Sequence, residues 1–181
     1  MKKSKPKISV IGQVFPIKGG ISHYNSNLCN SLLEKADLNI ISFLRIFPKW
    51  IHPLKSNKDY ESQNFFKGQA KFIFDVPNPL SWPKVAKDIV NYGSDALIFH
   101  WYTPVLAIPF WFVLARIKKL LPNCKIVAIC HNVIPHEKTL LDRFLSVAVL
   151  KRADVLVVHS KRDYENLRNW LPHANIKKLF H

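Results

Sequence analysis

The segment Ile126-Val-Ala-Ile-Cys-His-Asn-Val-Ile-Pro-His-Glu137 decides the expected fold of this 181-residue chain. It begins with a short, wholly apolar run, which is typical of a strand buried on both faces of a parallel sheet. The run ends abruptly in polar and titratable side chains, namely His131, Asn132, His136 and Glu137. Because open α/β sheets bind ligands outside the carboxyl ends of their strands, the segment predicts a ligand site. Histidine exchanges protons near neutral pH, so His131 is the candidate catalytic residue.

Apolar strands alternate with helical patterns along the rest of the chain. Strands are expected at 8–14, 38–44, 71–74, 96–99, 125–130, 154–159 and 176–180, and helices at 20–35, 82–92, 104–121, 138–151 and 161–171. Ser81 and Ser160 are expected N-caps, and Gly93 is expected to end a helix. The series predicts an α/β fold, a Rossmann-like parallel sheet with helices on both faces.

The turn between the first strand and the first helix contains two adjacent glycines. Gly19 and Gly20 have no Cβ, so the backbone there can approach a ligand closely, and a helix N-terminus suits a phosphate. A simple tight turn fits the same residues, because the segment is neither Gly-x-Gly-x-x-Gly nor a P-loop. In the helix that follows, the residues expected to face the core are Ile21, Leu28, Leu32 and Leu33.

A second polar and aromatic group, His100 and Trp101, follows the apolar strand at 96–99. This position fits the wall of an acceptor pocket, and it also fits an aromatic cover over the edge of the core. No metal site is expected, because His131 and His136 lack the His-Glu-x-x-His spacing and no cysteine pair has zinc-type spacing. The three cysteines are expected to be free, buried thiols in a reducing compartment.

Composition limits the classes of partner. The chain has 27 Lys and Arg against 12 Asp and Glu, a formal net charge of +15, and 48% hydrophobic residues. Such an excess predicts an anionic partner: a phosphate-rich ligand, an acidic membrane surface or nucleic acid. No recognition motif for nucleic acid is present, so we expect no nucleic-acid partner.

Domain organisation is expected to be simple. Residues 1–6 form a basic tail without the apolar region of a signal peptide, and 7–181 form one Rossmann-like domain. The most apolar window, 104–121, is interrupted by Pro109 and three charges, so a buried or interfacial helix is expected rather than a membrane span. The chain stops within the apparent strand at 176–180, which makes it look like part of a longer protein.

Taken together, these motifs resemble the N-terminal domain of a family 4 glycosyltransferase of the GT-B architecture. The segments that carry the resemblance are Phe15-Pro-Ile-Lys-Gly-Gly-Ile-Ser-His-Tyr-Asn25, the Phe47-Pro48 and Pro53 loop, Asn78-Pro-Leu-Ser-Trp82, Asp95-Ala-Leu-Ile-Phe-His-Trp101, His131-Asn-Val-Ile-Pro-His-Glu137 and Val155-Leu-Val-Val-His-Ser160. They cover nearly all of the chain from about residue 7.

The resemblance implies the acceptor-binding half of a retaining enzyme that moves a sugar from a nucleotide-sugar to a glycan or lipid-linked acceptor. It implies that Gly19 and Gly20 reach the donor's phosphates and that His131 is catalytic or contacts the donor sugar. The acceptor pocket is expected to include His100, Trp101, Asn132, His136 and Glu137. Apart from the donor substrate, no cofactor is expected. The family's C-terminal donor-binding domain does not follow in this chain, which is expected to be inactive alone, as a fragment or as a natural short protein.

Two other interpretations stay open. A dinucleotide-binding Rossmann domain is disfavoured, because Arg45 rather than an acidic residue ends the second strand. A non-catalytic membrane- or partner-binding domain is the alternative function. Relatives that build cell-envelope polysaccharides on lipid-linked acceptors suggest a cytoplasmic protein that is peripheral on the inner membrane. We expect salt-sensitive binding to anionic lipid through the basic, aromatic segment 45–72, which contains Phe47, Trp50, Tyr60, Phe65 and Phe66.

Overall fold

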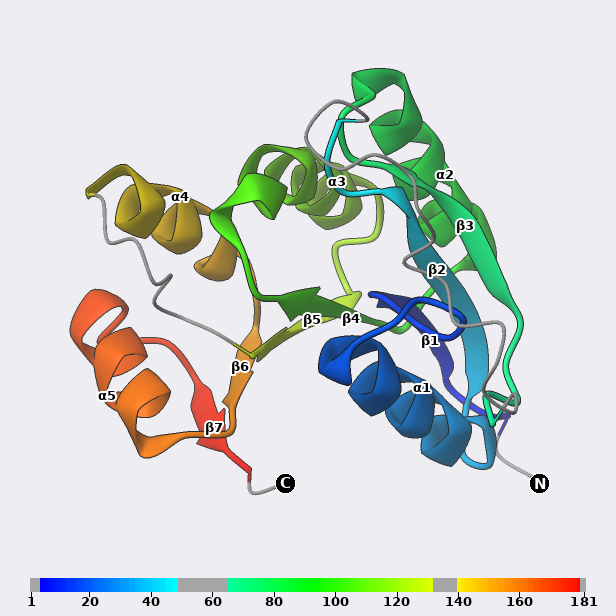
Figure 1. Cartoon of the computed structure of the whole chain (residues 1–181), viewed down its shortest axis with the longest axis horizontal. Coiled ribbons are helices and arrows are strands. Elements are labelled where there is room, and N and C mark those ends of the chain that lie inside the picture. The colour runs from blue at the N-terminus through cyan, green and yellow to red at the C-terminus, as the bar shows by residue number, and fades with distance from the viewer. Residues whose placement is uncertain (1–3, 49–64, 132–139, 180–181) are drawn as a thin grey trace. The chain divides into compact units, whose positions relative to one another are not determined.

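The computed structural model describes residues 4–48, 65–131 and 140–179, and the chain divides into two compact units (Figure 1). Unit 1 comprises Met1–Asp95 and unit 2 comprises Ala96–His181. Both units are built from parallel strands connected by helices. The predicted α/β, Rossmann-like fold class is therefore confirmed.

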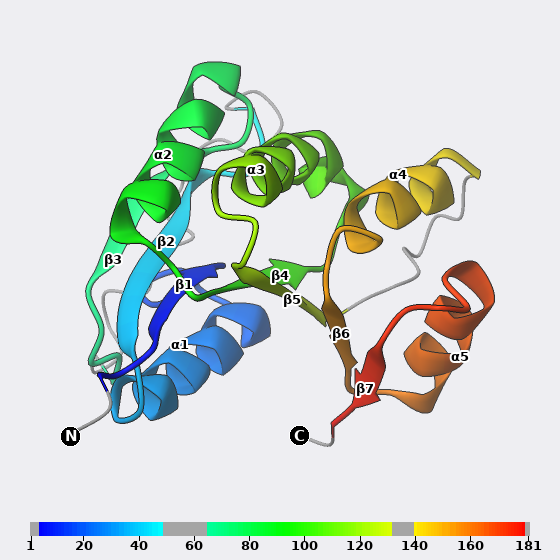
Figure 2. The same cartoon turned by 180° about the vertical axis from the view of Figure 1, so that it is seen from behind.

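Unit 1 contains three strands and two α-helices. Its elements are β1 (Lys7–Ile11), α1 (Gly20–Leu33), β2 (Asp37–Arg45), β3 (Ala70–Asp75), the 3-10 turn η1 (Pro79–Ser81) and α2 (Trp82–Tyr92). The strand order is β3-β2-β1, and β1 pairs in parallel with β2 from Lys7↔Asp37 to Ile11↔Ile41. Figures 1 and 2 show α1 and α2 on opposite faces of these strands. Helices thus cover both faces of the unit 1 strands, as the apolar runs predicted.

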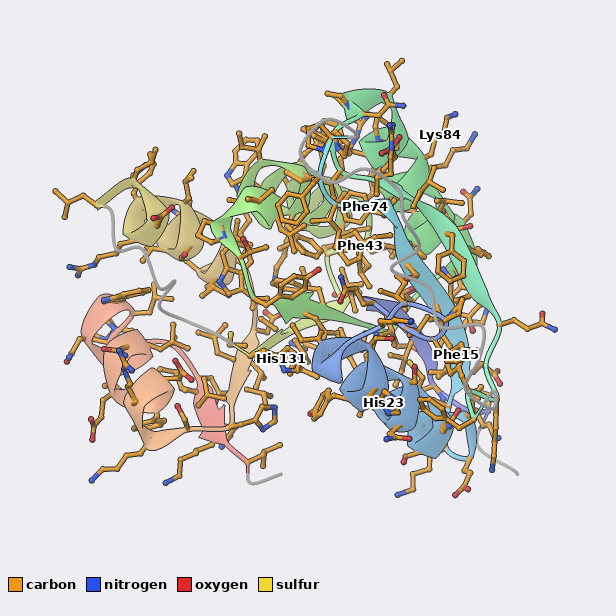
Figure 3. All side chains as sticks on the ribbon, viewed as in Figure 1. Phe15, His23, Phe43, Phe74, Lys84 and His131 are labelled. Atoms are coloured by element: carbon orange, nitrogen blue, oxygen red, sulfur yellow. The ribbon has the colours of Figure 1, made fainter. Side chains whose placement is uncertain are left out.

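The core of unit 1 lies between these helices and the strands. In β2, the consecutive residues 39–43 are all buried, which is the pattern of a strand covered on both faces. Phe43 of β2 and Phe74 of β3 stack with ring centroids 5.2 Å apart (Figure 3). Gly68 is needed where the chain returns toward β3, because a Cβ there would lie 2.7 Å from the Phe66 ring.

Helix α1 buries a different face from the one that its apolar residues predicted. Its fully buried residues are Ser22, Asn25, Ser26 and Cys29, whereas the four apolar residues expected to face the core are all partly exposed. The buried set recurs at positions i, i+3, i+4 and i+7, so it forms one helical stripe. Hydrogen bonds explain this choice, because Asn25 and Ser26 bind backbone groups of the loop that precedes α1.

Unit 2 contains four strands and three α-helices. Its elements are β4 (Ala96–Trp101), the 3-10 turn η2 (Pro104–Leu106), α3 (Ala107–Leu120), β5 (Lys125–Cys130), α4 (Leu140–Leu150), β6 (Val155–Val158), α5 (Lys161–Trp170) and β7 (Ile176–Lys178). The strand order is β4-β5-β6-β7, and all three pairings are parallel. Helices α3 and α4 lie side by side over these strands (Figures 1 and 2). The core includes Phe99 and Phe110, whose rings lie 4.9 Å apart.

The predicted helix ends are mostly confirmed. Gly93 ends α2 in the left-handed conformation with φ 70°, and the Ser160 hydroxyl accepts a hydrogen bond from Asp163 N–H at 3.0 Å. The expected cap by Ser81 is wrong. The Ser81 hydroxyl donates instead to the Asp75 carbonyl at 2.8 Å, and Asn78 caps the 3-10 turn that leads into α2. A tertiary contact to the end of β3 therefore replaces the local cap.

Two further expectations concern membrane crossing and thiols. Over the described ranges, no helix is long and apolar enough to cross a membrane. The three cysteines, Cys29, Cys124 and Cys130, are free and buried, as predicted. Burial raises the pKa of the Cys29 thiol to about 12, and it also raises the pKa of Cys130. Cys29 and Cys130 are therefore protonated and poorly reactive at neutral pH.

Candidate functional site

Histidines stand at the carboxyl ends of three adjacent strands of unit 2. His100 is the penultimate residue of β4, His131 directly follows β5, and His159 directly follows β6. The parallel register pairs the last residues of β5 and β6, so His131 and His159 leave the strands at the same level. The His131 N–H donates to the Trp101 carbonyl at 2.9 Å, which extends the strand pairing by one residue. The sheet thus brings the three imidazoles together.

His100 and His131 are in direct contact. His100 Nδ1 lies 2.7 Å from His131 Nε2, within hydrogen-bonding distance, and the rings are nearly parallel with centroids 5.1 Å apart. The His100 side chain is fully buried. Burial, followed by the positive charge that His131 and His159 can carry, holds the pKa of His100 well below its usual value. His100 is therefore neutral near pH 7. It can donate a hydrogen bond to His131 or accept one from it, but it does not carry a positive charge.

His159 is the third member of this group. Its ring centroid lies 5.9 Å from that of His131, and His159 Nδ1 lies 3.1 Å from the Leu179 carbonyl oxygen. A carbonyl oxygen only accepts hydrogen bonds, so His159 Nδ1 carries a proton. Sequence reasoning did not assign a role to His159. The signal was present, since Val155–Val158 is an apolar run that ends in a histidine as β5 does.

This histidine group is suited to acid–base chemistry or to binding hydroxyl groups. His131 and His159 are both partly exposed, whereas His100 is fully buried. A partly exposed imidazole supported by a neutral imidazole can accept or donate a proton at its reacting nitrogen. His131, which also contacts His100, is therefore a candidate for contact with a substrate, and its catalytic role stays a prediction.

The other predicted acceptor residues have different positions. Trp101 is 1% exposed and belongs to the core of unit 2. Its indole supports the end of β4 from within, so a direct contact with an acceptor stays a prediction. Asn132, His136 and Glu137 lie outside the described residues.

The two glycines predicted to approach phosphate lie at the start of α1 in unit 1. Gly19 has φ 125°, a conformation that side chains with a Cβ rarely adopt, and its carbonyl accepts from His23 N–H at 3.1 Å. A Cβ on Gly19 or Gly20 would meet nothing within 4 Å, so this backbone faces open space. Within the described residues, no side chain caps the first turn of α1. N–H groups at the start of a helix are suited to an anion, and the contact of Gly19 and Gly20 with phosphate stays a prediction.

The loop before α1 is held by buried polar residues that sequence reasoning missed. Phe15 N–H donates to Ser26 Oγ at 2.9 Å, and Asn25 Nδ2 donates to the Gln13 carbonyl at 3.0 Å. The Phe15 ring also meets the Phe65 ring edge-on at 5.7 Å, and His23 stacks on Phe65 at 4.6 Å. These contacts fix the path of the chain into the glycine pair.

The ends of β2 and β3 carry an ion pair. Arg45 Nε donates to Asp75 Oδ1 at 2.8 Å, and Arg45 Nη2 contacts Asp75 Oδ2. Asp75 is 5% exposed, so the bidentate bond satisfies a buried carboxylate. The hydrogen bond to Asp75 raises the pKa of the Arg45 guanidinium, which stays charged. Arg45 stands where a dinucleotide-binding fold has an acidic ribose-binding residue, so the structure does not favour that alternative.

Metal binding was not expected from the sequence. In residues 4–48, 65–131 and 140–179, no group of three or more His, Cys, Asp or Glu side chains has an arrangement that could hold a metal ion. At the strand ends, the rings of His100 and His131 are stacked, and the His159 ring is tilted against that of His131.

Comparison with known proteins identifies the fold. No protein-family model matches the sequence, and no curated protein matches it. Among solved structures, an α-glucosyltransferase in complex with UDP and a 13-mer DNA containing a HMU base matches with a TM-score of 0.62 and 12% identity, over 97% of this chain and 42% of that chain. An α-glucosyltransferase in complex with UDP-glucose and DNA containing an abasic site matches with a TM-score of 0.59 and 12% identity, over 98% and 42%.

These likenesses define what the chain shares with glycosyltransferases. At 12% identity they show the fold alone, that of part of a glycosyltransferase, and they support the GT-B half expected from the motifs. This chain spans about two fifths of the length of these enzymes. Membership of family 4 stays a prediction.

The exclusion of nucleic acid from the partners is wrong. It was based on the absence of a DNA-recognition motif, but the matching α-glucosyltransferases are in complex with DNA. Proteins with this fold are thus found in complex with DNA, and the +15 formal charge of this chain suits a polyanion.

Proposed function

We propose that this chain is the acceptor-binding half of a retaining glycosyltransferase, which moves a sugar from a nucleotide-sugar to an acceptor. The observation that carries the proposal is the histidine group at the carboxyl ends of β4, β5 and β6, because ligand sites of parallel sheets form at these ends. The shared fold with α-glucosyltransferases supports the same conclusion.

Three residues have defined roles in this proposal. His131 contacts the reacting sugar or acceptor hydroxyl, as a proton acceptor or as a hydrogen-bond partner. His100 stays neutral and holds the His131 ring by its hydrogen bond. Gly20, at the uncapped start of α1, admits the donor's phosphates to the helix N-terminus.

The class of acceptor follows from charge. A glycan or lipid-linked acceptor is our first choice, because lipid-linked acceptors carry phosphates that suit a chain of formal charge +15. DNA is a second candidate, because the structural neighbours hold it. A cytoplasmic location follows from a nucleotide-sugar donor and three free thiols, and it belongs to the proposal.

Acceptor binding by the chain itself tests this function. Saturation-transfer NMR would compare lipid-linked oligosaccharides in micelles, free oligosaccharides and duplex DNA as ligands for the wild type and for His131→Ala. We expect one class to bind, with at least a tenfold weaker affinity in the variant. His173→Ala, which changes an exposed histidine outside the group, is the matched control. Absence of binding in every ligand class, or equal affinity of the wild type and His131→Ala, would favour a non-catalytic role for the chain.

A further inference from the structure

Unit 2 exposes large apolar side chains on two neighbouring helical elements. Leu140, Leu141 and Phe144, in the first turns of α4, are 87%, 63% and 69% exposed. Ile108 and Trp111 of α3 are 62% and 46% exposed. Helix α4 packs against α3 (Figure 1) and also against the turn η2, which precedes α3. We call these five residues the α3–α4 surface.

Folding of unit 2 does not explain this surface. Helix α3 already buries an inner face, which includes Phe110, Val113, Leu114 and Ile117. Ile108 and Trp111, three residues apart, lie on its outer face, where a helix of a globular protein normally carries polar groups. Helix α4 likewise buries Ser146, Val149 and Leu150, while the apolar residues of its first turns stay exposed. Clusters of this kind mark interaction sites.

Cations border the same surface. Arg152 lies 4.8 Å from the Trp111 ring centroid, and Arg116 lies 5.5 Å from the Phe112 ring centroid. The exposed basic residues on these helices and at their ends are Arg116, Lys119, Arg143 and Lys151. Of the carboxylates on these helices and at their ends within the described residues, Asp154 is bound by Lys118 at 2.9 Å, and Asp142 in α4 is the other one. The border of the surface is therefore net positive.

We propose that the α3–α4 surface docks on an anionic lipid bilayer, with α3 and α4 in the plane of the interface. Leucine and phenylalanine side chains enter the boundary of the acyl chains, while arginine and lysine reach the phosphates of the headgroups. Trp111 combines an apolar ring with a polar N–H, the combination enriched at membrane interfaces. The proposal does not depend on glycosyl transfer.

The chemistry of the surface favours a bilayer over other occupants. A second copy of this chain would bring the same positive border against itself, and like charges repel. DNA offers phosphates but no apolar phase for Leu140, Leu141 and Phe144. A bilayer of anionic lipid supplies both the negative charge and the apolar phase.

This location differs from the membrane segment expected from the sequence, 45–72. Within that segment, Phe66 is 8% exposed, and Phe65 packs against Phe15 and His23. These two aromatic residues therefore contribute to the packing of unit 1. Trp50 and Tyr60 lie outside the described residues. In the described part of the chain, most of the exposed large apolar side chains lie on α3 and α4, although Leu44 and Leu80 of unit 1 are also exposed.

Vesicle co-sedimentation of the whole chain tests the proposal. The vesicles contain three parts phosphatidylcholine to one part phosphatidylglycerol, and pure phosphatidylcholine vesicles are the neutral control. Wild-type protein is expected to pellet with the anionic vesicles and to be released by high salt. The triple variant Leu140→Asn, Leu141→Asn, Phe144→Asn should bind at least tenfold more weakly, because each side chain withdrawn from an apolar phase weakens binding by about that factor.

Matched variants separate the surface from general effects. Leu80→Asn changes a leucine of unit 1 that is 76% exposed, and we expect it to bind vesicles as the wild type does. Ile108→Asn changes α3 alone and should weaken binding in the same direction as the triple variant. Circular dichroism should show unchanged helix content, because all of these side chains are largely exposed.

Two outcomes would overturn the proposal. One is equal binding by the wild type and the triple variant, or weakening by Leu80→Asn as large as that by the triple variant. The other is a wild-type dimer in sedimentation velocity that dissociates in the triple variant while binding to anionic vesicles is unchanged. The second result would assign the α3–α4 surface to contact between copies of this chain.

Discussion

The carboxyl ends of the strands carry different chemistry in the two units. In unit 1, Arg45 and Asp75 end β2 and β3 and bind each other, so their charges are used within the unit. In unit 2, the ends of β4, β5 and β6 carry His100, His131 and His159, with ring centroids of neighbours 5.1 and 5.9 Å apart. At the strand ends of unit 1, the charges of Arg45 and Asp75 neutralise each other, whereas the strand ends of unit 2 carry three titratable histidines. In the proposed function, unit 1 therefore supplies a loop and a backbone site, whereas unit 2 supplies the reactive side chains.

The largest effect is expected at His131. In any form of the protein that carries a donor-binding half, His131→Ala should lower turnover by roughly 10²–10⁴, the usual contribution of a positioned acid–base group. The free energy of unfolding should change far less, because His131 is only partly buried. Steady-state kinetics and urea unfolding measure the two quantities. Near-normal turnover of His131→Ala would contradict the assignment of the reactive side chains to the strand ends of unit 2.

Loss of the Arg45–Asp75 ion pair in unit 1 should lower the stability of the protein instead of its activity. Asp75→Asn keeps the shape of the side chain but removes the charge that Arg45 binds, and it should lower the free energy of unfolding by roughly 2–3 kcal/mol. Lys71→Ala is the control, because the Lys71–Asp88 pair is more exposed and should contribute less than about 1 kcal/mol. Urea unfolding of both variants tests this. Equal effects would contradict the assignment of Arg45–Asp75 as a structural pair.

The buried polar face of α1 should give the next effect. Ser26→Ala leaves the Phe15 N–H without its hydrogen bond, and we expect a cost of about 1–2 kcal/mol in the free energy of unfolding. Ser31→Ala is the matched control, because the exposed Ser31 hydroxyl bonds only to Asn27 O of its own helix. The comparison sharpens the role of unit 1, since Ser26 is expected to hold the loop that leads to Gly19.

The smallest effect concerns acid stability and Asp154 in unit 2. Partial burial acts to raise the pKa of Asp154, but hydrogen bonds from Ile126 N–H and Lys118 Nζ outweigh it and hold the pKa below its usual value. A carboxylate with a depressed pKa stabilises the fold above its unfolded pKa and loses that contribution as the pH falls through the folded pKa. Wild-type stability should therefore decline below about pH 4, and Asp154→Asn should show a flatter profile. Parallel profiles would show that Asp154 is not the group responsible.

Strands and most helix ends could be predicted from the sequence, because local patterns determine them. Apolar runs such as Ile126–Cys130 specify buried parallel strands, and Ser160 and Gly93 act within their own turns. The buried face of α1 could not be predicted from apolar spacing. Backbone groups of the preceding loop required Asn25 and Ser26 as partners, and only the path of the chain shows that requirement.

The candidate site was predicted in part. His131 was recognisable, because an apolar strand ended in a titratable residue. Its contact with His100 depends on β4 and β5 being neighbours, which local sequence does not specify. His159 showed the same pattern at the end of β6 and was missed. The exposure of Leu140 and Phe144 is likewise a property of packing, since their helix is apolar on several sides.

The most direct test of the proposed function is an acceptor titration of the chain labelled with ¹³C at its histidine rings. The resonance of His131, assigned with the His131→Ala variant, should shift with a saturable dependence on the acceptor that binds. His23, on α1 of unit 1, and the exposed His173 should keep their shifts. A saturable shift at His23 or His173 with none at His131 would contradict the placement of the acceptor site at the carboxyl ends of β4, β5 and β6.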